Sequence, residues 1–264
     1  MERITLSVRG ARREFLFCGS PGRGPLVVFL HGTGATAAWA DGETGWSALA
    51  AREGFSLAIP QALPPDPDRP PKFLTNPPRW QDEGGAEDPE FLAAVIDHCG
   101  AGRACVTGFS NGAAMAFRVA TELTDRVAAV APVAGHCRVP DPRPARPVPT
   151  LYAVGSADPL VPLRGGDVRN PWHHRYVRRP PVVETLEAWA RAIGCDVVPR
   201  PEPGGGPARA ETFPGPVLFR SVVIDGLGHH WPGGKGQFNH RIAGPPADTV
   251  NGTEMVWEFF RHQV

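Results

Sequence analysis

The sequence lacks the features that direct a protein to nucleic acid, to a membrane or to a metal. Its 27 Lys and Arg residues balance its 27 Asp and Glu residues, so no net charge attracts nucleic acid or an anionic surface. No apolar run approaches the length of a transmembrane helix, and no Gly-Lys-Ser or Gly-Lys-Thr of a phosphate-binding loop occurs. The five cysteines are an odd number, with no Cys-x-x-Cys pair and no zinc spacing. We therefore expect no nucleic-acid partner, no membrane span and no metal.

No signal peptide is recognisable, because residues 1–10 already alternate like a strand. The chain as given is therefore expected in the cytoplasm. A leader removed ahead of this sequence would instead make the protein secreted or periplasmic. The sequence does not indicate an oligomeric state.

Apolar segments of strand length alternate with segments of helical periodicity along the chain. Residues 25–30 form a continuous apolar run, typical of a strand buried on both faces of a parallel sheet. Residues 4–8 and 14–17 predict an antiparallel edge hairpin. Further strands are predicted at 55–59, 127–133, 149–154 and 217–224, and helices at 46–53, from Asp88, at 111–123, at 182–193 and at the C-terminus. This pattern predicts one α/β domain over residues 1–264, with a mainly parallel sheet covered by helices on both faces.

The segment Cys105–Met115 contains the motif around which the chain is organised. Gly108-Phe109-Ser110-Asn111-Gly112 is a Gly-x-Ser-x-Gly sequence between a predicted strand and a helix, a context that holds a serine exposed on a strained turn. Side chains at Gly108 and Gly112 would collide where the strand and helix pass close together. The chain has 31 glycines, so the motif alone also fits an ordinary strand-to-helix turn.

A serine nucleophile needs a histidine base and an acid that orients the base. In the α/β-hydrolase arrangement these occur in the order Ser, Asp or Glu, His, each after a strand. Asp158 follows the predicted strand 149–154, and His229 follows the last predicted strand. Two backbone N–H groups must bind the oxyanion, and we expect them from Thr33, after an early strand, and from Asn111.

Other interpretations of these residues stay open. Asp158 before proline also fits a turn, and Asp225 is a second candidate acid. His230 is a second candidate base, while His136 at a strand end fits a structural role. Gly32-Thr33-Gly34-Ala35-Thr36-Ala37 formally fits a dinucleotide fingerprint, but the next strand ends in Pro60-Gln61 rather than in the acidic residue that binds the ribose.

Four segments resemble the family of polyhydroxybutyrate depolymerase-like esterases, also called LpqC-type, which is related to feruloyl and acetylxylan esterases. They are residues 25–32, 108–112, 155–162 and 226–233, in the family's order, and Gly-x-Gly-His-x-Trp-Pro-Gly is the most specific. The resemblance implies the α/β-hydrolase fold, with Ser110 as nucleophile, Asp158 as acid and His229 as base. The family often bonds the cysteine matching Cys195 to one near the last strand, yet none occurs in 196–264.

The expected function is a serine esterase that acts through an acyl-enzyme on hydroxyalkanoate esters and needs no cofactor. Feruloyl or acetylxylan esters are the alternative, and a non-catalytic binding protein on the same scaffold is a further one. The long loops 60–80 and 164–181 are expected to shape the substrate pocket. The candidate substrate contacts are His31, Trp80, Trp172 and Trp231.

Overall fold

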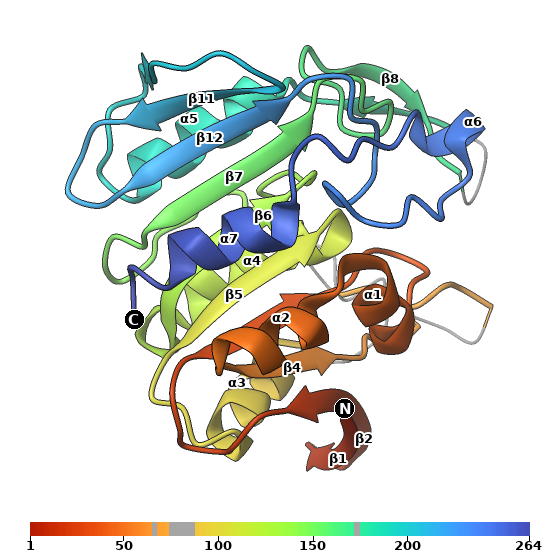
Figure 1. The fold of residues 1–264 in the computed structure, drawn as a ribbon, viewed down its shortest axis with the longest axis vertical. Coiled ribbons are helices and arrows are strands. Elements are labelled where there is room, and N and C mark those ends of the chain that lie inside the picture. Colours follow the sequence, from red (N-terminus) through yellow and green to blue (C-terminus); the bar gives the residue numbers. More distant parts are fainter. Residues whose placement is uncertain (65–67, 74–87, 172–174) are drawn as a thin grey trace.

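Strands and helices alternate in the computed structural model, which describes residues 1–64, 68–73, 88–171 and 175–264 (Figure 1). The strands are β1 (Glu2–Val8), β2 (Ala11–Cys18), β3 (Leu26–Leu30), β4 (Ser56–Pro60), β5 (Ala104–Phe109), β6 (Val127–Val133), β7 (Thr150–Gly155), β8 (Gly166–Arg169), β9 (Tyr176–Arg179), β10 (Arg200–Pro201), β11 (Ala208–Phe213) and β12 (Phe219–Ile224). The helices are α1 (Ala37–Thr44), α2 (Trp46–Glu53), α3 (Asp88–His98), α4 (Asn111–Glu122), the short η2 (Thr124–Arg126), α5 (Val182–Ala192), α6 (His240–Ala243) and α7 (Gly252–Phe260).

A ten-stranded sheet in the order β1-β2-β4-β3-β5-β6-β7-β12-β11-β10 forms the centre of the structure. The strands from β4 to β12 in this order run parallel, whereas the pairs at both ends of the sheet are antiparallel. The predicted N-terminal edge hairpin is confirmed, with β1 and β2 paired in antiparallel register. The α/β-hydrolase fold predicted from the sequence is likewise confirmed.

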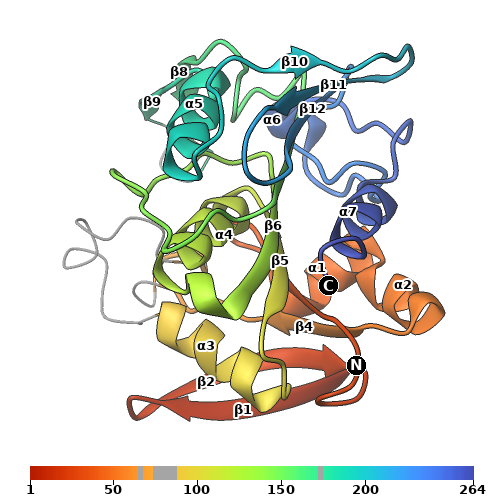
Figure 2. The same cartoon turned by 90° about the vertical axis from the view of Figure 1, so that its left-hand side faces the viewer.

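Helices cover both faces of this sheet, and Figure 2 shows the two layers on opposite sides of it. One buried cluster includes side chains of α3, α4 and α5, such as Leu92, Met115 and Trp189. The other includes side chains of α1, α2 and α7, such as Trp46 and Val256. Every residue of β3, β4, β5 and β7 is buried, as the continuous apolar runs of these strands predict.

The structure adds elements that the apolar periodicity did not indicate. The segment 164–181, predicted as a long loop, contains a small separate sheet of β8 and β9. β10 and β11 extend the sheet at its edge, where mostly part-exposed and exposed residues give no apolar signal. Helix α1 begins at an N-cap, Thr36, whose side chain accepts a hydrogen bond from Trp39 N–H. No helix among the described residues has the length and apolar character needed to cross a membrane.

Candidate active site

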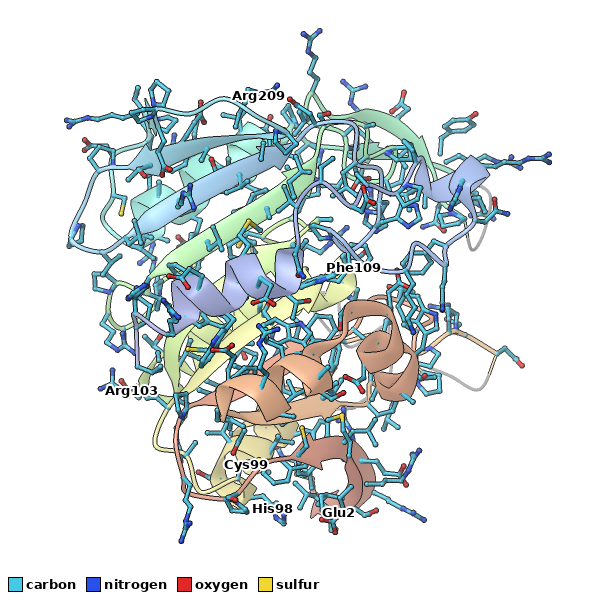
Figure 3. All side chains as sticks on the ribbon, in the orientation of Figure 1. Glu2, His98, Cys99, Arg103, Phe109 and Arg209 are labelled. Carbon is cyan, nitrogen blue, oxygen red and sulfur yellow. The ribbon has the colours of Figure 1, made fainter. Side chains whose placement is uncertain are left out.

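Ser110 lies at the carboxyl end of β5, in the turn that leads directly into α4. Its φ of 56° and ψ of −110° are unusual for a residue with a side chain, and such strain costs about 1–3 kcal/mol. The turn is held from both sides, because Ser110 N–H donates to Val133 O at 2.9 Å and Ser110 O accepts from Ala114 N–H. Phe109, the residue before it, is labelled at the same end of β5 in Figure 3. The fold therefore maintains a strained serine where the parallel strands end.

The two glycines of the motif are required for steric reasons, because neither position has room for a Cβ. A Cβ on Gly108 would lie 2.4 Å from the carbonyl oxygen of Gly112, and a Cβ on Gly112 would lie 1.9 Å from the carbonyl oxygen of Leu30. Both distances are far below van der Waals contact, so the predicted collisions are confirmed. The close approach lets α4 start directly above β3 and β5.

The structure brings Ser110, His229 and Asp158 together in one hydrogen-bonded chain. Ser110 Oγ lies 2.9 Å from His229 Nε2, and His229 Nδ1 lies 2.7 Å from Asp158 Oδ2. Since a carboxylate only accepts, Nδ1 carries the proton and donates to Asp158, which leaves Nε2 free to accept from the serine hydroxyl. Asp158 and His229 are buried, at 4% and 5% exposure, whereas Ser110 is partly exposed. An imidazole in this tautomer can take the proton of the hydroxyl.

Backbone groups fix the orientation of Asp158. Its Oδ1 accepts from the N–H groups of Leu160 and Val161, each at 2.8 Å, so only Oδ2 is left for the histidine. The acid loop also packs tightly against the histidine loop, because a Cβ on Gly155 would lie 2.0 Å from the carbonyl oxygen of Leu227. The distance between acid and base is thus set by backbone packing.

The alternative candidates lie elsewhere. The His230 ring bonds Gly244 O through Nε2 at 2.9 Å, and burial lowers its pKa. Asp225 forms an ion pair with Arg209 at 2.7 Å on the surface. His136 is buried with Nδ1 3.0 Å from Thr185 Oγ1, and burial lowers its pKa to about 4. Among the hydrogen bonds and ion pairs of the described residues, none joins these three side chains to Ser110.

His31 orients the peptide that bears the Thr33 N–H. Ala62 N–H donates to His31 Nε2 at 3.1 Å, so the ring proton is on Nδ1, which donates to Gly32 O at 2.8 Å. Burial lowers the pKa of His31 to about 4, so this ring is neutral at pH 7. The peptide between Gly32 and Thr33 is trans, and its N–H therefore points opposite to the carbonyl that His31 holds. Within the described residues, no backbone acceptor is found for the N–H of Thr33 or of Asn111.

The structure corrects two of the expected substrate contacts, because both side chains are buried. His31 is fully buried with both ring nitrogens hydrogen-bonded, so neither nitrogen is free to bind a substrate. Trp231 is 2% exposed, donates to Thr253 Oγ1 and packs edge-on against Phe29 in the core. Trp80 and Trp172, the other two expected contacts, lie outside the described residues.

A small cavity lies beside the serine, lined by His31 and Trp231 together with residues that the sequence did not single out. Its volume is about 10 Å3, room for one water, and it lies between the serine turn, α1 and the loop after β12. Gly32 and Phe109 line it near Ser110, and a Cβ on Gly32 would touch Ser110 Cβ at 3.4 Å. Trp39 and Phe238 line it too, with ring centroids 4.7 Å apart.

Glu43 also lines this cavity, and its hydrogen bond to Gly236 joins α1 to the loop after β12. Its Oε1 accepts from Gly236 N–H at 2.7 Å, while its buried Oε2 has no partner among the described residues. Burial raises the pKa of this carboxyl. A lone glutamate in a segment rich in small residues gave no sequence signal, because its partner is 193 positions away.

All five cysteines are free, and each is buried or half-buried. Cys195 lies 3.8 Å from Val217 O, and burial raises its pKa. The disulfide that the resemblance associates with this position is therefore not formed. Burial also raises the pKa of Cys99 and Cys105 to about 12, as expected for core thiols.

The sequence of the chain is similar to those of known esterases. No family model matches the chain. It is 32% identical over 278 residues to the protein named "Putative esterase NocK" from Nocardia uniformis subsp. tsuyamanensis, covering 90% of this chain and 76% of NocK. It is also 29% identical over 173 residues to "Feruloyl esterase B" of Piromyces equi, covering 57% of this chain but only 30% of that protein.

Solved structures show the same fold at low sequence identity. An acetyl xylan esterase from Aspergillus awamori superposes with a TM-score of 0.60 at 17% identity, over 87% of this chain and 94% of that one. The esterase PE8 superposes with a TM-score of 0.58 at 16% identity, over 94% and 98% of the two chains. The solved structures show the α/β-hydrolase fold, and the extent of the match to NocK shows the family: the chain belongs to the NocK esterase family.

Proposed function

We propose that this chain is a serine carboxylic ester hydrolase in which Ser110 is the nucleophile, His229 the general base and Asp158 the residue that orients it. The observation that carries this proposal is the two-bond chain of 2.9 Å and 2.7 Å through the imidazole. A buried acid fixes the tautomer, and a strained turn presents the hydroxyl. A merely structural serine would need neither feature.

The reaction proceeds in two halves. His229 Nε2 takes the proton of Ser110 as Oγ attacks the ester carbonyl carbon, and the imidazolium then returns that proton to the departing alcohol. The acyl group stays on Oγ. A water molecule, deprotonated by the same nitrogen, attacks the acyl carbon, and the proton passes to Ser110 as the carboxylic acid leaves. Asp158 stabilises the imidazolium in both halves and keeps its own charge.

Two backbone N–H groups, of Thr33 and Asn111, stabilise the oxyanion of each tetrahedral intermediate. Each stands beside Ser110 in the fold, Thr33 directly after Gly32, where an added Cβ would meet Ser110 Cβ, and Asn111 as the next residue in the chain. Neither N–H has a backbone acceptor within the described residues, so both are available to a ligand. Loss of one such donor costs about 100- to 1,000-fold in rate.

The substrate class proposed is hydroxyalkanoate esters, on the strength of the sequence resemblance. Acetylated or feruloylated sugars are the second candidate, and the names of the relatives favour them. Besides the feruloyl esterase, the "Bifunctional acetylxylan esterase/xylanase XynS20E" of Neocallimastix patriciarum is 25% identical over 143 residues, covering 52% of this chain and 20% of that protein. The chain thus spans under a third of each of these two relatives.

The catalytic assignment is tested with matched pairs of variants. Ser110→Ala should abolish hydrolysis of p-nitrophenyl acetate and labelling by a fluorophosphonate probe. His229→Ala should lose activity to a similar degree, because the two residues act as one unit. The matched control is His230→Ala, which removes the neighbouring imidazole. The assignment would be refuted if Ser110→Ala kept full activity, or if His230→Ala lost activity while His229→Ala kept it. A wild-type protein that the fluorophosphonate probe does not label would favour a non-catalytic scaffold.

The substrate class is tested with three esters on one protein preparation. They are a 3-hydroxybutyrate dimer, methyl ferulate and an acetylated xylo-oligosaccharide, compared by kcat/KM. We expect the dimer to give the highest value. A preference of tenfold or more for either sugar-type ester would replace the hydroxyalkanoate proposal while leaving the triad intact.

A further inference from the structure

The side chain of Asn111 holds a segment of the chain that is distant in sequence. Its Oδ1 accepts from Phe73 N–H at 2.6 Å, and its Nδ2 donates to Phe73 O at 3.0 Å. The amide thus pairs with both backbone groups of one residue, as a neighbouring strand would. Because one bond needs an acceptor and the other a donor, this pair of hydrogen bonds also determines which end of the Asn111 amide is the oxygen.

The same short segment is tied to the loop of the other oxyanion donor. Gly34 N–H donates to Pro71 O at 2.8 Å, directly after Thr33. The Phe73 ring is 1% exposed and lies 5.1 Å from the His31 ring, centroid to centroid. Residues 71–73 therefore form a strut between the loop of Thr33 and the start of α4.

A continuous set of contacts then joins the two donors. It runs from the Asn111 amide to Phe73, from the Phe73 ring to His31, and from His31 Nδ1–H to the Gly32 carbonyl. That carbonyl belongs to the same planar peptide as the Thr33 N–H, so fixing one fixes the other. We propose that Asn111 is a positioning residue as well as a donor: its side chain, through the strut 71–73 and His31, keeps the Thr33 N–H aligned with its own N–H on one oxyanion.

This proposal rests on the proposed function, since it needs an oxyanion at Ser110. Its physical basis is that both donors must lie about 2.7–3.1 Å from a single oxygen, whereas they come from segments 78 positions apart (Thr33 and Asn111). A misplacement of about 1 Å can cost on the order of 100-fold in rate. Burial of His31 and Phe73 removes the freedom by which the loop could drift.

The test separates the Asn111 side chain from its N–H. Asn111→Ala keeps the backbone donor but removes both bonds to Phe73, and Phe73→Leu keeps the bonds but removes the ring from His31. We expect kcat for p-nitrophenyl acetate to fall about 10- to 100-fold in each, with KM within about threefold. The double variant should lose no more than about the larger single loss, because both changes break one path. Phe213→Leu, which trims a buried ring stacked on Phe219 far along the sheet, controls for general loosening of the core and should keep kcat.

A transition-state mimic supplies a readout that a structural role would not move. A trifluoromethyl ketone forms an oxyanion adduct with an active serine, so its Ki should rise in proportion to the fall in kcat/KM across the variants. Wild-type kcat in Asn111→Ala, or a Ki that does not follow kcat/KM, overturns the inference while Ser110→Ala stays inactive and the proposed function stands. If Asn111→Ala does not fold, Phe73→Leu decides by the same criterion. Full activity of Ser110→Ala would overturn both proposals.

Discussion

Replacement of Asp158 by asparagine should stop catalysis while leaving the fold intact. The reason lies in the two N–H groups, of Leu160 and Val161, that both donate to Asp158 Oδ1. An asparagine must keep its oxygen in that position, because its NH2 group cannot accept from two donors. The NH2 group therefore faces His229 Nδ1, at the site that Oδ2 occupies 2.7 Å away.

The consequence is a histidine in the wrong tautomer. With a donor facing it, Nδ1 must accept, so the proton moves to Nε2, which then cannot take the proton of Ser110. Loss of the correct tautomer in a serine triad lowers kcat by about 10,000-fold. This corresponds to roughly 5.4 kcal/mol in the barrier, at 1.36 kcal/mol for each factor of ten.

The assay is kcat for p-nitrophenyl acetate at pH 7.5, with Ser110→Ala as the inactive reference. Melting temperatures should agree within a few degrees, because the asparagine oxygen keeps both backbone bonds. The control is Asp225→Asn, which neutralises an acid on the histidine loop that pairs with Arg209 at the surface and should keep full activity. A tenth or more of wild-type kcat in Asp158→Asn would refute the reasoning.

Three further predictions concern stability, each measured by urea unfolding. Gly112→Ala should prevent folding or destabilise strongly, since its Cβ meets the β3 backbone at 1.9 Å, whereas Gly42→Ala in α1 has open space and should stabilise by up to about 1 kcal/mol. Arg13→Met should lower the free energy of unfolding by about 3–5 kcal/mol, because Arg13 and Asp88 form a 2.5 Å ion pair with both side chains 2% exposed. Adding Asp88→Asn should recover part of the lost stability, and additive losses of the two substitutions would contradict this prediction. Burial lowers the pKa of His31 to about 4 from 6.5, so the unfolded chain binds the proton first, and the stability that His31 contributes should fall by roughly 3 kcal/mol as pH drops from about 6.5 to 4. His31→Asn should therefore lose less stability over this range than the wild type, and an equally steep fall would contradict this.

The positions of the candidate site residues could be predicted because a parallel sheet gathers its strand ends. Ser110 and His229 are 119 positions apart, and His229 and Asp158 are 71 apart, yet each follows a buried strand. The carboxyl ends of parallel strands share one edge, so residues placed just after them meet there. The glycine requirement of the serine turn is equally local, because backbone atoms alone cause the collisions.

The contacts around the site depend on the paths of loops, for which sequence periodicity carries no information. Glu43 meets Gly236 across 193 positions, and Phe73 meets Asn111 across 38, without a strand register to set either pairing. The hairpin of β8 and β9 was missed for a related reason, since its strands have four residues each and all but one of these residues are exposed or part-exposed. Short, solvated pairs leave no apolar signature.

His31 shows why a polar residue at the end of a buried strand is ambiguous. The same position could face a substrate or be covered by another segment, and the sequence does not say what covers it. Here Ala62 occupies one ring nitrogen and Phe73 packs against the ring, so the imidazole can act only through the peptide it holds. The role of the Asn111 side chain, directly after the serine, is equally ambiguous in the sequence. Any residue there except proline supplies an N–H, but only a side chain that both donates and accepts at this length can pair with Phe73, so substitutions that preserve the donor should still separate the two halves of the oxyanion site.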